Sequence, residues 1–172
     1  IVKTGKVRHI ALSNETPWGL SEFLNKSETK NLPRVQSVQN AYNLLNRTYE
    51  YGMSEFAHRS SVGLLAYSPL AQGYLSGKYL NGAMPKGSRT QLFGRGQRYE
   101  TPAAENSIKA YVDYAKKIGM DPSVMANAFV NSREFVTSNI IGATTMDQLK
   151  LAVGSWEVKL SEEDFKEFDA IH

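Results

Sequence analysis

The sequence predicts an α/β protein built around a parallel β-sheet, and three observations support this. Short apolar runs rich in β-branched residues alternate with longer segments in which apolar residues recur at helical spacing. Four such strand and helix units follow one another, and strict alternation means parallel strands joined by right-handed crossovers. Hydrophobic residues make up 41% of the 172 residues, enough for a contiguous core. Periodicity leaves open whether the sheet is doubly wound or closed into a barrel.

The first unit begins with residues 7–12, an apolar run that suits a buried parallel strand opening into a loop. A helix is expected next, because Pro17 suits a first helical turn and apolar residues then recur at near-helical spacing until Pro33. The same unit is then repeated. Strands are predicted at residues 35–39, 62–67 and 138–142, and helices at residues 52–59, 103–118 and 123–133.

Two further helices are predicted near the end of the chain from their capping residues. Thr145 is the expected cap of a helix that runs through Leu149 and Val153. Ser161 precedes three acidic residues, which favour the positive end of a last helix. Residues 70–102 break the regular alternation, because this long segment is basic and rich in Gly, Pro, Arg and Ser. Its length favours a functional loop over a linker.

Composition excludes several classes of function. The 20 basic and 17 acidic side chains leave a net charge of +3, too small an excess to imply a nucleic-acid partner. No apolar run approaches the roughly 20 residues needed to span a bilayer, so no membrane partner is expected either. The chain has no cysteine, which fits a reducing compartment and a cytoplasmic location. Residues 1–6 lack a signal-peptide pattern and suggest the end of a helix capped by Gly5, so that the chain begins inside a domain.

Metal binding and RNA binding each have only a weak candidate. His9, His58 and His172 are scattered without the spacing of metal ligands, and no metal site is predicted. Residues 94–99 combine two arginines with a tyrosine and could form a small RNA-binding patch. We favour the interpretation that this hexamer is the rim of the loop at residues 70–102.

Polar residues follow each predicted strand at its carboxyl end, which is where parallel α/β proteins bind ligands. Hydroxyl and amide groups orient a neutral carboxamide, whereas small residues and backbone amides near a helix start receive a phosphate. These polar segments are residues 13–14, 39–40, 67–70 and 142–145.

The same residues also have purely structural interpretations. Ser13 and Asn14 fit an ordinary loop start or helix cap, and Tyr67 fits a core aromatic. Lys78 and Arg89 fit solvated charges on a long loop. Residue types alone do not decide between these interpretations and a ligand site.

Four motifs, in order, resemble those of the aldo-keto reductase family over essentially the whole chain. They read Ala-Leu-Ser-Asn-Glu-Thr at residues 11–16, Ala-Tyr-Ser-Pro-Leu-Ala at 66–71, Leu-Ser-Gly-Lys-Tyr at 75–79 and Ile-Gly-Ala-Thr-Thr at 141–145. Within the family, the chain is similar to the Tas-like branch, which is related to the voltage-gated potassium-channel beta subunits. The resemblance favours the ligand-site interpretation of the polar segments.

The resemblance implies a fold, a cofactor and a reaction. The family fold is a (β/α)8 TIM barrel that binds NADPH (or NADP) in an extended form without a Rossmann motif. Residues 1–172 match the C-terminal half of that barrel, strands five to eight with their helices, and residues 70–102 match its long cofactor loop. The implied activity is oxidoreductase activity, the NADPH-dependent reduction of a small aldehyde or ketone to an alcohol.

The resemblance also implies cofactor-binding roles for individual residues. Tyr67 matches the aromatic residue whose ring stacks on the nicotinamide, and Ser13, Asn14 and Gln39 match the residues that hold its carboxamide. Arg89 and Thr144 match contacts to the 2′-phosphate, which favours NADPH over NADH, and Gln148 matches a position near the adenosine. The loop that wraps the pyrophosphate is matched by Ser68, Pro69, Leu70, Ala71, Gly73, Ser76 and Lys78.

Two departures from the family pattern limit what is assigned. Leu151 and Ala152 stand where many relatives carry Glu and Asn that bind adenine, so no adenine contact is assigned to them. The family's catalytic Asp, Tyr, Lys and His act from the ends of strands two to four. No catalytic residue is therefore assigned in this chain, and the chain by itself is expected to be inactive.

Two rival interpretations stay open, and both affect the expected partners. The chain could belong to a nucleotide-sensing regulatory subunit, or it could be an inactive fragment. Half of a barrel would leave two strand edges unpaired and an apolar interior face uncovered, so pairing with a second copy or with the other half is expected. The apolar residues expected on that face are Val7, Ile10, Val35, Val38, Leu64 and Ile140.

Overall fold

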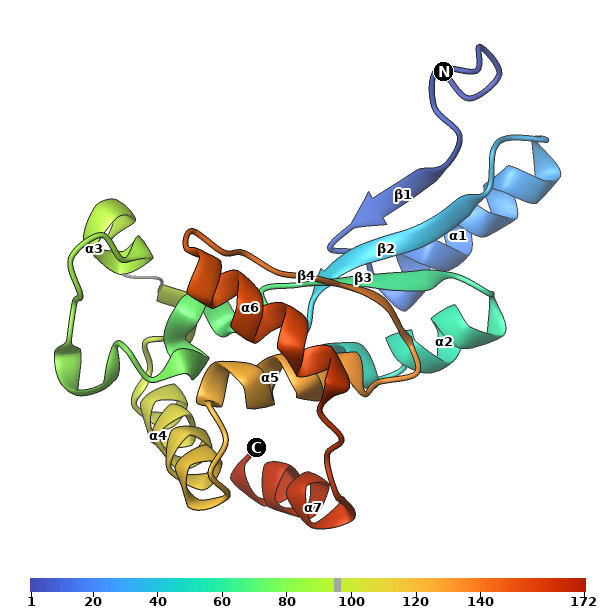
Figure 1. The fold of residues 1–172 in the computed structure, drawn as a ribbon. Helices are drawn as coiled ribbons and strands as arrows, with labels where there is room; N and C mark the ends of the chain where they lie inside the picture. Colours follow the sequence, from blue (N-terminus) through green and yellow to red (C-terminus); the bar gives the residue numbers. More distant parts are fainter. Residues whose placement is uncertain (95–96) are drawn as a thin grey trace.

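Four parallel strands form the centre of the computed structural model, which describes residues 1–94 and 97–172 (Figure 1). Each strand pairs with its neighbours in sequence order, so the sheet order is β1-β2-β3-β4. The prediction of an α/β protein with a parallel sheet is therefore confirmed. The strands are β1 (Ile10–Ser13), β2 (Val35–Ala41), β3 (Gly63–Tyr67) and β4 (Val136–Ile140).

Helices separate the strands, and several begin where a side chain satisfies the first free backbone N–H groups. The caps predicted at Thr145 and Ser161 are confirmed, and Ser161 forms a reciprocal capping box with Asp164. None of the helices in the described part of the chain is both long enough and apolar enough to span a membrane. The α-helices are α1 (Pro17–Thr29), α2 (Met53–Arg59), α3 (Arg89–Phe93), α4 (Pro102–Lys117), α5 (Pro122–Asn131), α6 (Met146–Gly154) and α7 (Glu162–Ile171).

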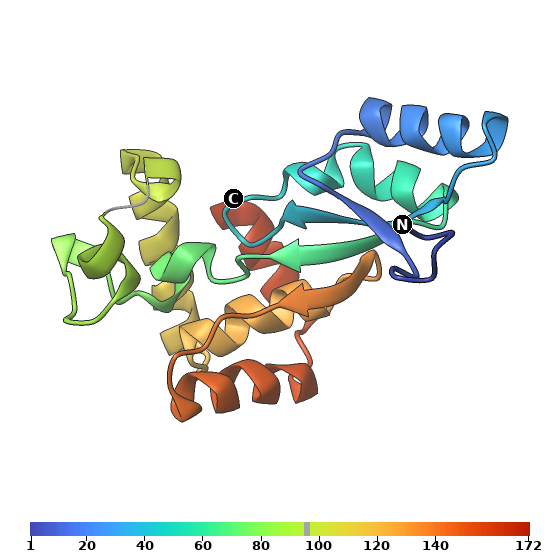
Figure 2. The ribbon, with the colours of Figure 1, turned by 90° about the horizontal axis from the view of Figure 1, so that it is seen from above.

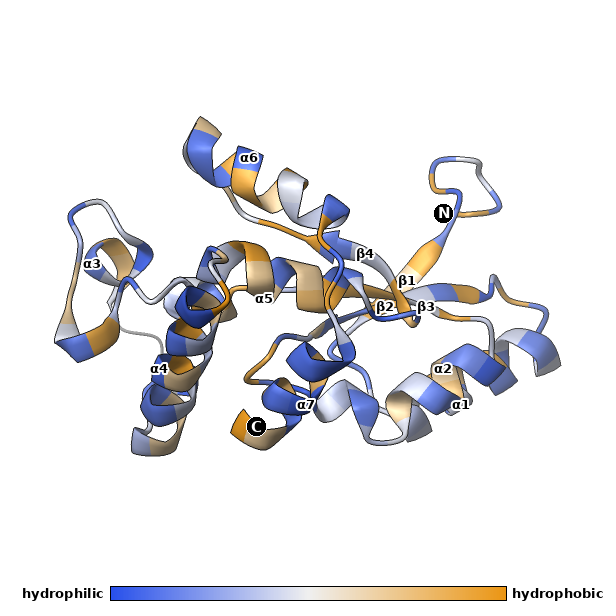
Figure 3. Ribbon diagram, turned by 60° about the horizontal axis from the view of Figure 1, so that its bottom comes forward, coloured by the Kyte–Doolittle hydropathy of each residue, from blue (hydrophilic) through white to orange (hydrophobic). Residues whose placement is uncertain are grey.

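The helices α1, α2 and α5 cover one face of the sheet. α1 packs against β2, α2 against β3 and α5 against β4. Figure 2 shows α1 and α2 beyond β1 and β2, and α5 and α6 beyond β4. In Figure 3, α5 is coloured more strongly as hydrophobic than α4 or α7, and all of residues 125–130 are buried. The core of the protein therefore lies between the sheet and its helices.

The two faces of the sheet differ in polarity. Val38 and Leu64 pair in register on the helix-covered face and are fully buried. The pairing register places residues of mostly small or polar type in one row on the opposite face, and each of them is at least partly exposed. That row is Ser13, Gln39, Leu65 and Ser138.

This arrangement corrects the expected apolar interior face. Val38 and Leu64 are wholly buried on the helix-covered face, and Val35, at the start of β2 where the pairing register shifts, is wholly buried as well. The strands alternate their side chains between faces, and the larger apolar side chains lie on the helix side. Ile10 and Ile140, which lie in the two outer strands, are 36% and 37% exposed.

Several predicted boundaries also change. Residues 1–6 form turns, with the Gly5 N–H donating to the Val2 carbonyl at 2.9 Å, so the expected helix end is wrong. β4 begins two residues earlier than predicted because Val136 already pairs with Leu64 of β3. The loop at residues 70–102 contains short helices: the 3-10 helices η2 (Ala71–Ser76), η3 (Leu80–Gly82) and η4 (Gln97–Tyr99), besides α3.

Glu50 is the centre of a polar network that joins the end of β2 to the segment just after α5 and to α7. Its carboxylate accepts hydrogen bonds from Tyr42 Oη at 2.5 Å and from Arg47 Nε and Nη2 at 2.9 and 2.8 Å. Arg47 also pairs with Asp169 of α7 at 2.6 Å, and Arg133 donates to Tyr42 at 3.1 Å. Burial alone raises the pKa of Glu50, but the bonds from Arg47 and Tyr42 outweigh burial and lower the pKa below its usual value. The charged carboxylate therefore stabilises the fold.

Candidate functional site

The carboxyl ends of the four strands lie along the same edge of the sheet (Figure 2). The loop at residues 70–102 extends from that edge, as does the turn that leads from β4 into α6. In parallel α/β proteins this edge is where ligands bind, since the loops there are free to vary while the strands stay fixed. We call this edge the mouth of the sheet.

Four predicted residues from three strands meet at the mouth. Ser13 of β1 pairs in register with Gln39 of β2, and the N–H of Asn14 donates to the Gln39 carbonyl at 2.9 Å. The hydroxyl of Tyr67, at the end of β3, donates to Asn14 Oδ1 at 2.7 Å. Asn14 Nδ2 in turn donates to Ser13 Oγ at 3.2 Å. The structure thus gathers Ser13, Asn14, Gln39 and Tyr67 into one cluster, in which Tyr67 is only half-buried.

Asn40 holds this cluster in place, and sequence reasoning did not assign it a role. Its Oδ1 accepts from the N–H of Glu15 at 3.0 Å, while its Nδ2 donates to the Glu15 carbonyl at 2.8 Å. The side chain therefore pairs with the backbone directly after Asn14, which has a left-handed φ of 54°. A non-glycine residue in that region is strained and persists only where its surroundings hold it. The available signal was an asparagine beside Gln39 at a strand end.

The turn after β3 is the second part of the site. Ser68, Ala71 and Gln72 all have positive φ, at 57°, 47° and 60°. Leu70 is partly buried, Pro69 is buried and Ala71 is fully buried. This turn therefore presents strained backbone together with the partly exposed side chains of Ser68, Leu70 and Gln72.

Gly73, Ser76 and Lys78 complete that turn. Ser76 Oγ donates to the Gly73 carbonyl at 2.7 Å. A Cβ atom on Gly73 would lie 3.0 Å from Lys78 Cε, and the φ of 98° there is also one that only glycine adopts easily. The Lys78 ammonium therefore lies close against bare backbone, 5.1 Å from the ring centre of Tyr79. A basic group over exposed backbone suits a phosphate.

The remaining predicted residues do not join these two groups. Arg89 begins α3, where its guanidinium lies 5.9 Å from the ring centre of Phe93. Thr144 lies just before α6 and Gln148 lies in its first turn. The Thr144 N–H donates to Gln148 Oε1 at 2.9 Å. Figure 2 shows α3 and the start of α6 apart. The expected proximity of Arg89 and Thr144 is thus not seen between the described atoms of these residues.

Asn43 is a second unpredicted residue that shapes the mouth. It is wholly buried, and its Nδ2 donates both to the Ser68 carbonyl at 2.9 Å and to Tyr99 Oη at 3.2 Å. Its Oδ1 accepts from the N–H groups of Leu45 and Asn46. Asn43 therefore ties the far end of the long loop to the end of β3. Nothing in its sequence neighbourhood distinguishes it from an ordinary turn residue.

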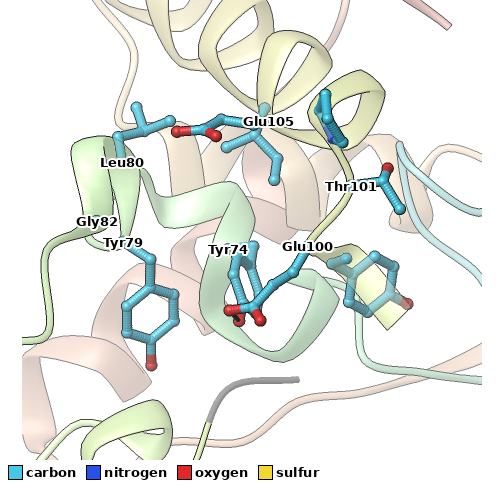
Figure 4. Close-up of a pocket in the computed structure, with 10 residues that line it drawn as sticks. Tyr74, Tyr79, Leu80, Gly82, Glu100, Thr101 and Glu105 are labelled. Atoms are coloured by element: carbon cyan, nitrogen blue, oxygen red, sulfur yellow. Dashed lines mark hydrogen bonds between the residues drawn. The ribbon is translucent and has the colours of Figure 1, made fainter. Parts of the chain in front are cut away.

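A cavity of about 390 Å³ lies inside the long loop rather than at the mouth (Figure 4). Tyr74 and Glu100 point toward each other there, with the Tyr74 hydroxyl donating to Glu100 at 2.6 Å. Tyr79, Tyr99 and Glu105 also line it, and none of the predicted cofactor residues does. The cavity therefore reflects the packing of the loop on α4.

Two of the weaker sequence predictions concern other chemistries. Within residues 1–94 and 97–172, no group of three or more His, Cys, Asp or Glu side chains is placed to hold a metal ion. The hexamer at residues 94–99 includes Arg95 and Gly96, which lie outside the described residues. The RNA-binding interpretation of that hexamer therefore stays a prediction.

Comparison with known proteins identifies relatives along the whole chain. The model of the Aldo/keto reductase family matches residues 1–172. The chain is 46% identical over 170 residues to Protein tas of Escherichia coli (strain K12), which covers 99% of the chain and 49% of that protein. It is 36% identical over 157 residues to an Aldo-keto reductase of Babesia bovis, covering 87% of the chain and 55% of the relative. It is 33% identical over 155 residues to the L-glyceraldehyde 3-phosphate reductase of E. coli (strain K12), covering 87% of the chain and 44% of that protein. The chain thus spans about half the length of these relatives.

Proposed function

The chain belongs to the aldo/keto reductase family of oxidoreductases, and from this we propose that it supplies the cofactor-binding half of an NADPH-dependent enzyme that reduces aldehydes or ketones to alcohols. The observation that carries the proposal is the cluster of Ser13, Asn14, Gln39 and Tyr67 at the mouth of the sheet. Amide and hydroxyl groups fixed by one another, beside a half-buried ring, suit a flat carboxamide-bearing heterocycle.

The residues present at the mouth fit each part of the proposed cofactor. Gln39 and Ser13 offer donors and acceptors to the carboxamide, and the ring of Tyr67 offers a flat apolar surface to the nicotinamide. Lys78, over the backbone at Gly73, offers a cation for the pyrophosphate. When bound, NADPH supplies the hydride that reduces the carbonyl carbon. The role of the chain's own residues is to bind and orient this cofactor.

We further propose that the four strands are strands five to eight of a (β/α)8 barrel. The all-parallel order, the helices on one face and the mostly small, polar open face support this proposal. The whole chain, residues 1–172, would then be one barrel half with its cofactor loop at residues 70–102. We also propose a cytoplasmic location, which the cysteine-free composition fits.

Arg89 provides the test of cofactor choice. We expect Arg89→Ala, in a full-length protein that contains this chain, to weaken NADPH binding by about 1.5–3 kcal/mol, the usual value of a hydrogen bond to a charged group. NADH binding should change far less, because NADH has no 2′-phosphate for the guanidinium to contact. Titration of each cofactor by fluorescence gives the two dissociation constants. Arg59→Ala on α2, where Arg59 pairs with Glu55 at the surface, is the matched control. Equal weakening of both cofactors by Arg89→Ala would contradict the assignment.

The open edges of the sheet provide a test of the half-barrel. Among the described strands, β1 and β4 each pair on one side only, and an unpaired parallel edge is an association site. We expect the isolated chain of 19.2 kDa to associate with a second copy at micromolar concentration, as measured by light scattering. Ile140→Lys, which places a charge on the exposed face of the edge strand β4, should shift the chain toward monomer. A well-folded wild-type monomer would contradict the half-barrel proposal, because it would show that the edges of β1 and β4 need no further pairing partner.

A further inference from the structure

The helix α6, together with the 3-10 helix η5 (Ser155–Glu157) that continues it, carries its side chains in three rows. The row at Ala152 and Ser155 packs on α5, because Ser155 is wholly buried and its hydroxyl accepts from Asn131 Nδ2 at 3.1 Å. The row at Asp147 and Lys150 is polar and exposed, as expected of a surface facing water. The third row has neither a packing partner nor a polar character.

This third row is apolar, and we call it the apolar stripe. Its members are Met146, Leu149, Val153 and Trp156. Residues three or four positions apart lie on one face of a helix, so the stripe is continuous. Its side chains are between 38% and 68% exposed, and α6 has no buried residue at all. Single exposed apolar residues are ordinary at a protein surface, whereas a contiguous apolar patch marks an interaction site.

The apolar stripe and the open edge of β4 belong to the same side of the molecule. Figure 2 shows α6 as the outermost helix on the β4 side of the sheet. Among the described strands, β4 pairs with β3 alone. The helix α5 packs on both β4 and α6, so it holds the strand edge and the stripe in one unit. A partner that pairs with β4 therefore arrives beside α6.

The direction of the strands defines the chemistry of that partner. A strand that pairs in parallel with β4 continues into a crossover, usually a helix, and right-handed crossovers place that helix on the face of the sheet that α5 already covers. A helix in that position has an apolar face of its own, which the uncharged stripe complements. The relatives are about twice as long as this chain, and the proposed half-barrel assigns four further strands to the rest of such a protein.

We propose that the apolar stripe is the docking surface for the first strand and helix unit of the other barrel half, whose strand pairs with β4 and whose helix packs against α6. The inference rests on the half-barrel of the proposed function. It also bears on the cofactor site, because Thr144 and Gln148 lie at the start of the same helix. Docking of the stripe therefore fixes the two residues proposed to contact the adenosine end of NADPH.

The test is thiol labelling, to which the chain contributes no cysteine of its own. In a full-length protein that contains this chain, labelling by iodoacetamide at one introduced cysteine is followed by mass spectrometry. We expect Val153→Cys to react about tenfold or more slowly in the native protein than in urea. Asp147→Cys, in the polar row of the same helix, should react at similar rates in both. Both positions are exposed in this chain, so without an occupant they would react alike, and equal native rates would overturn the proposal.

Hydrogen exchange of β4 in the same protein separates failure of this inference from failure of the half-barrel. We expect the backbone N–H groups on both edges of β4 to be protected together with Val153→Cys. Protection of β4 with a freely reacting Val153→Cys would mean that the half-barrel stands and the stripe assignment fails. Rapid exchange at the open edge of β4 would overturn the half-barrel and the inference with it. Protection of Val153→Cys that depends on protein concentration would assign the stripe to a second copy and overturn the proposal.

Discussion

The isolated 172-residue chain should show no measurable NADPH-dependent reduction of 4-methylbenzaldehyde. Carbonyl reduction needs a proton donor positioned at the developing alkoxide, and such general-acid catalysis contributes about 10²- to 10⁴-fold. The polar residues gathered at the mouth are suited to binding and orientation. The Tyr67 hydroxyl is already bonded to Asn14 and is proposed to lie beneath the nicotinamide rather than at a substrate. No residue of the chain is assigned the role of proton donor.

The measurement is the loss of NADPH absorbance in a preparation verified free of full-length reductase. A full-length protein that contains this chain serves as the positive control under identical conditions. Turnover by the chain alone would contradict the assignment of the catalytic groups to another part of the barrel. Binding of NADPH by the full-length protein without turnover of any aldehyde would instead favour the alternative function, a nucleotide-sensing module.

Glu50→Ala should destabilise the fold by about 1.5–3 kcal/mol, the usual contribution of a hydrogen bond to a charged group, because the Arg47–Glu50 pair is partly buried. The substitution removes the acceptor of the buried Tyr42 hydroxyl and two of the hydrogen bonds of Arg47, whose side chain is only 12% exposed and which keeps its pair with Asp169. Urea denaturation at pH 7 gives the free energy of unfolding. Glu55→Ala is the control, because Glu55 and Arg59 form an exposed pair that should contribute less than about 1 kcal/mol. A similar loss from both variants would contradict the role given to the Glu50 network.

The same network makes stability depend on pH in a definite direction. The pKa of Glu50 is lower in the folded protein than in the unfolded chain, so its contribution is fully present above the unfolded value of about 4.3. That contribution is lost as the pH falls through the folded pKa. The difference in stability between wild type and Glu50→Gln should therefore shrink as the pH is lowered below about 4. A constant difference down to pH 2 would exclude this explanation.

The elements that sequence predicted well are those set by local chemistry. Thr145 and Ser161 cap helices because their side chains accept from backbone N–H groups three residues along the chain, a contact that local sequence predicts. The end of β3 at Tyr67 follows in the same way from a short apolar run ahead of Pro69. The parallel direction of the strands followed from alternation alone, whereas their order in the sheet did not.

What the sequence left undetermined depends on residues distant along the chain. Asn40 bonds a residue 25 positions away, and Asn43 bonds Tyr99 across 56 positions. The periodic pattern of apolar residues predicts neither of these long-range hydrogen bonds. The side of the sheet that Val38 and Leu64 face was also misassigned, because strand periodicity defines two faces without saying which one the helices cover. The residues of the site cluster were predicted from the resemblance of the motifs. The hydrogen bonds between these residues could be identified only in the folded structure.

The bonds made by Asn40 and Asn43 determine when the loops of the mouth lose their conformational freedom. Ordering a mobile side chain at an interface costs about 0.5–1.5 kcal/mol, and ordering a backbone residue costs about 1–2 kcal/mol. Since both asparagines fix backbone around Asn14 and Ser68 without any ligand, that entropy is lost when the protein folds. A ligand that binds at the mouth then meets a surface that is already ordered. The bonds of Asn40 to the Glu15 backbone therefore reduce the conformational entropy that a ligand at the mouth has to remove.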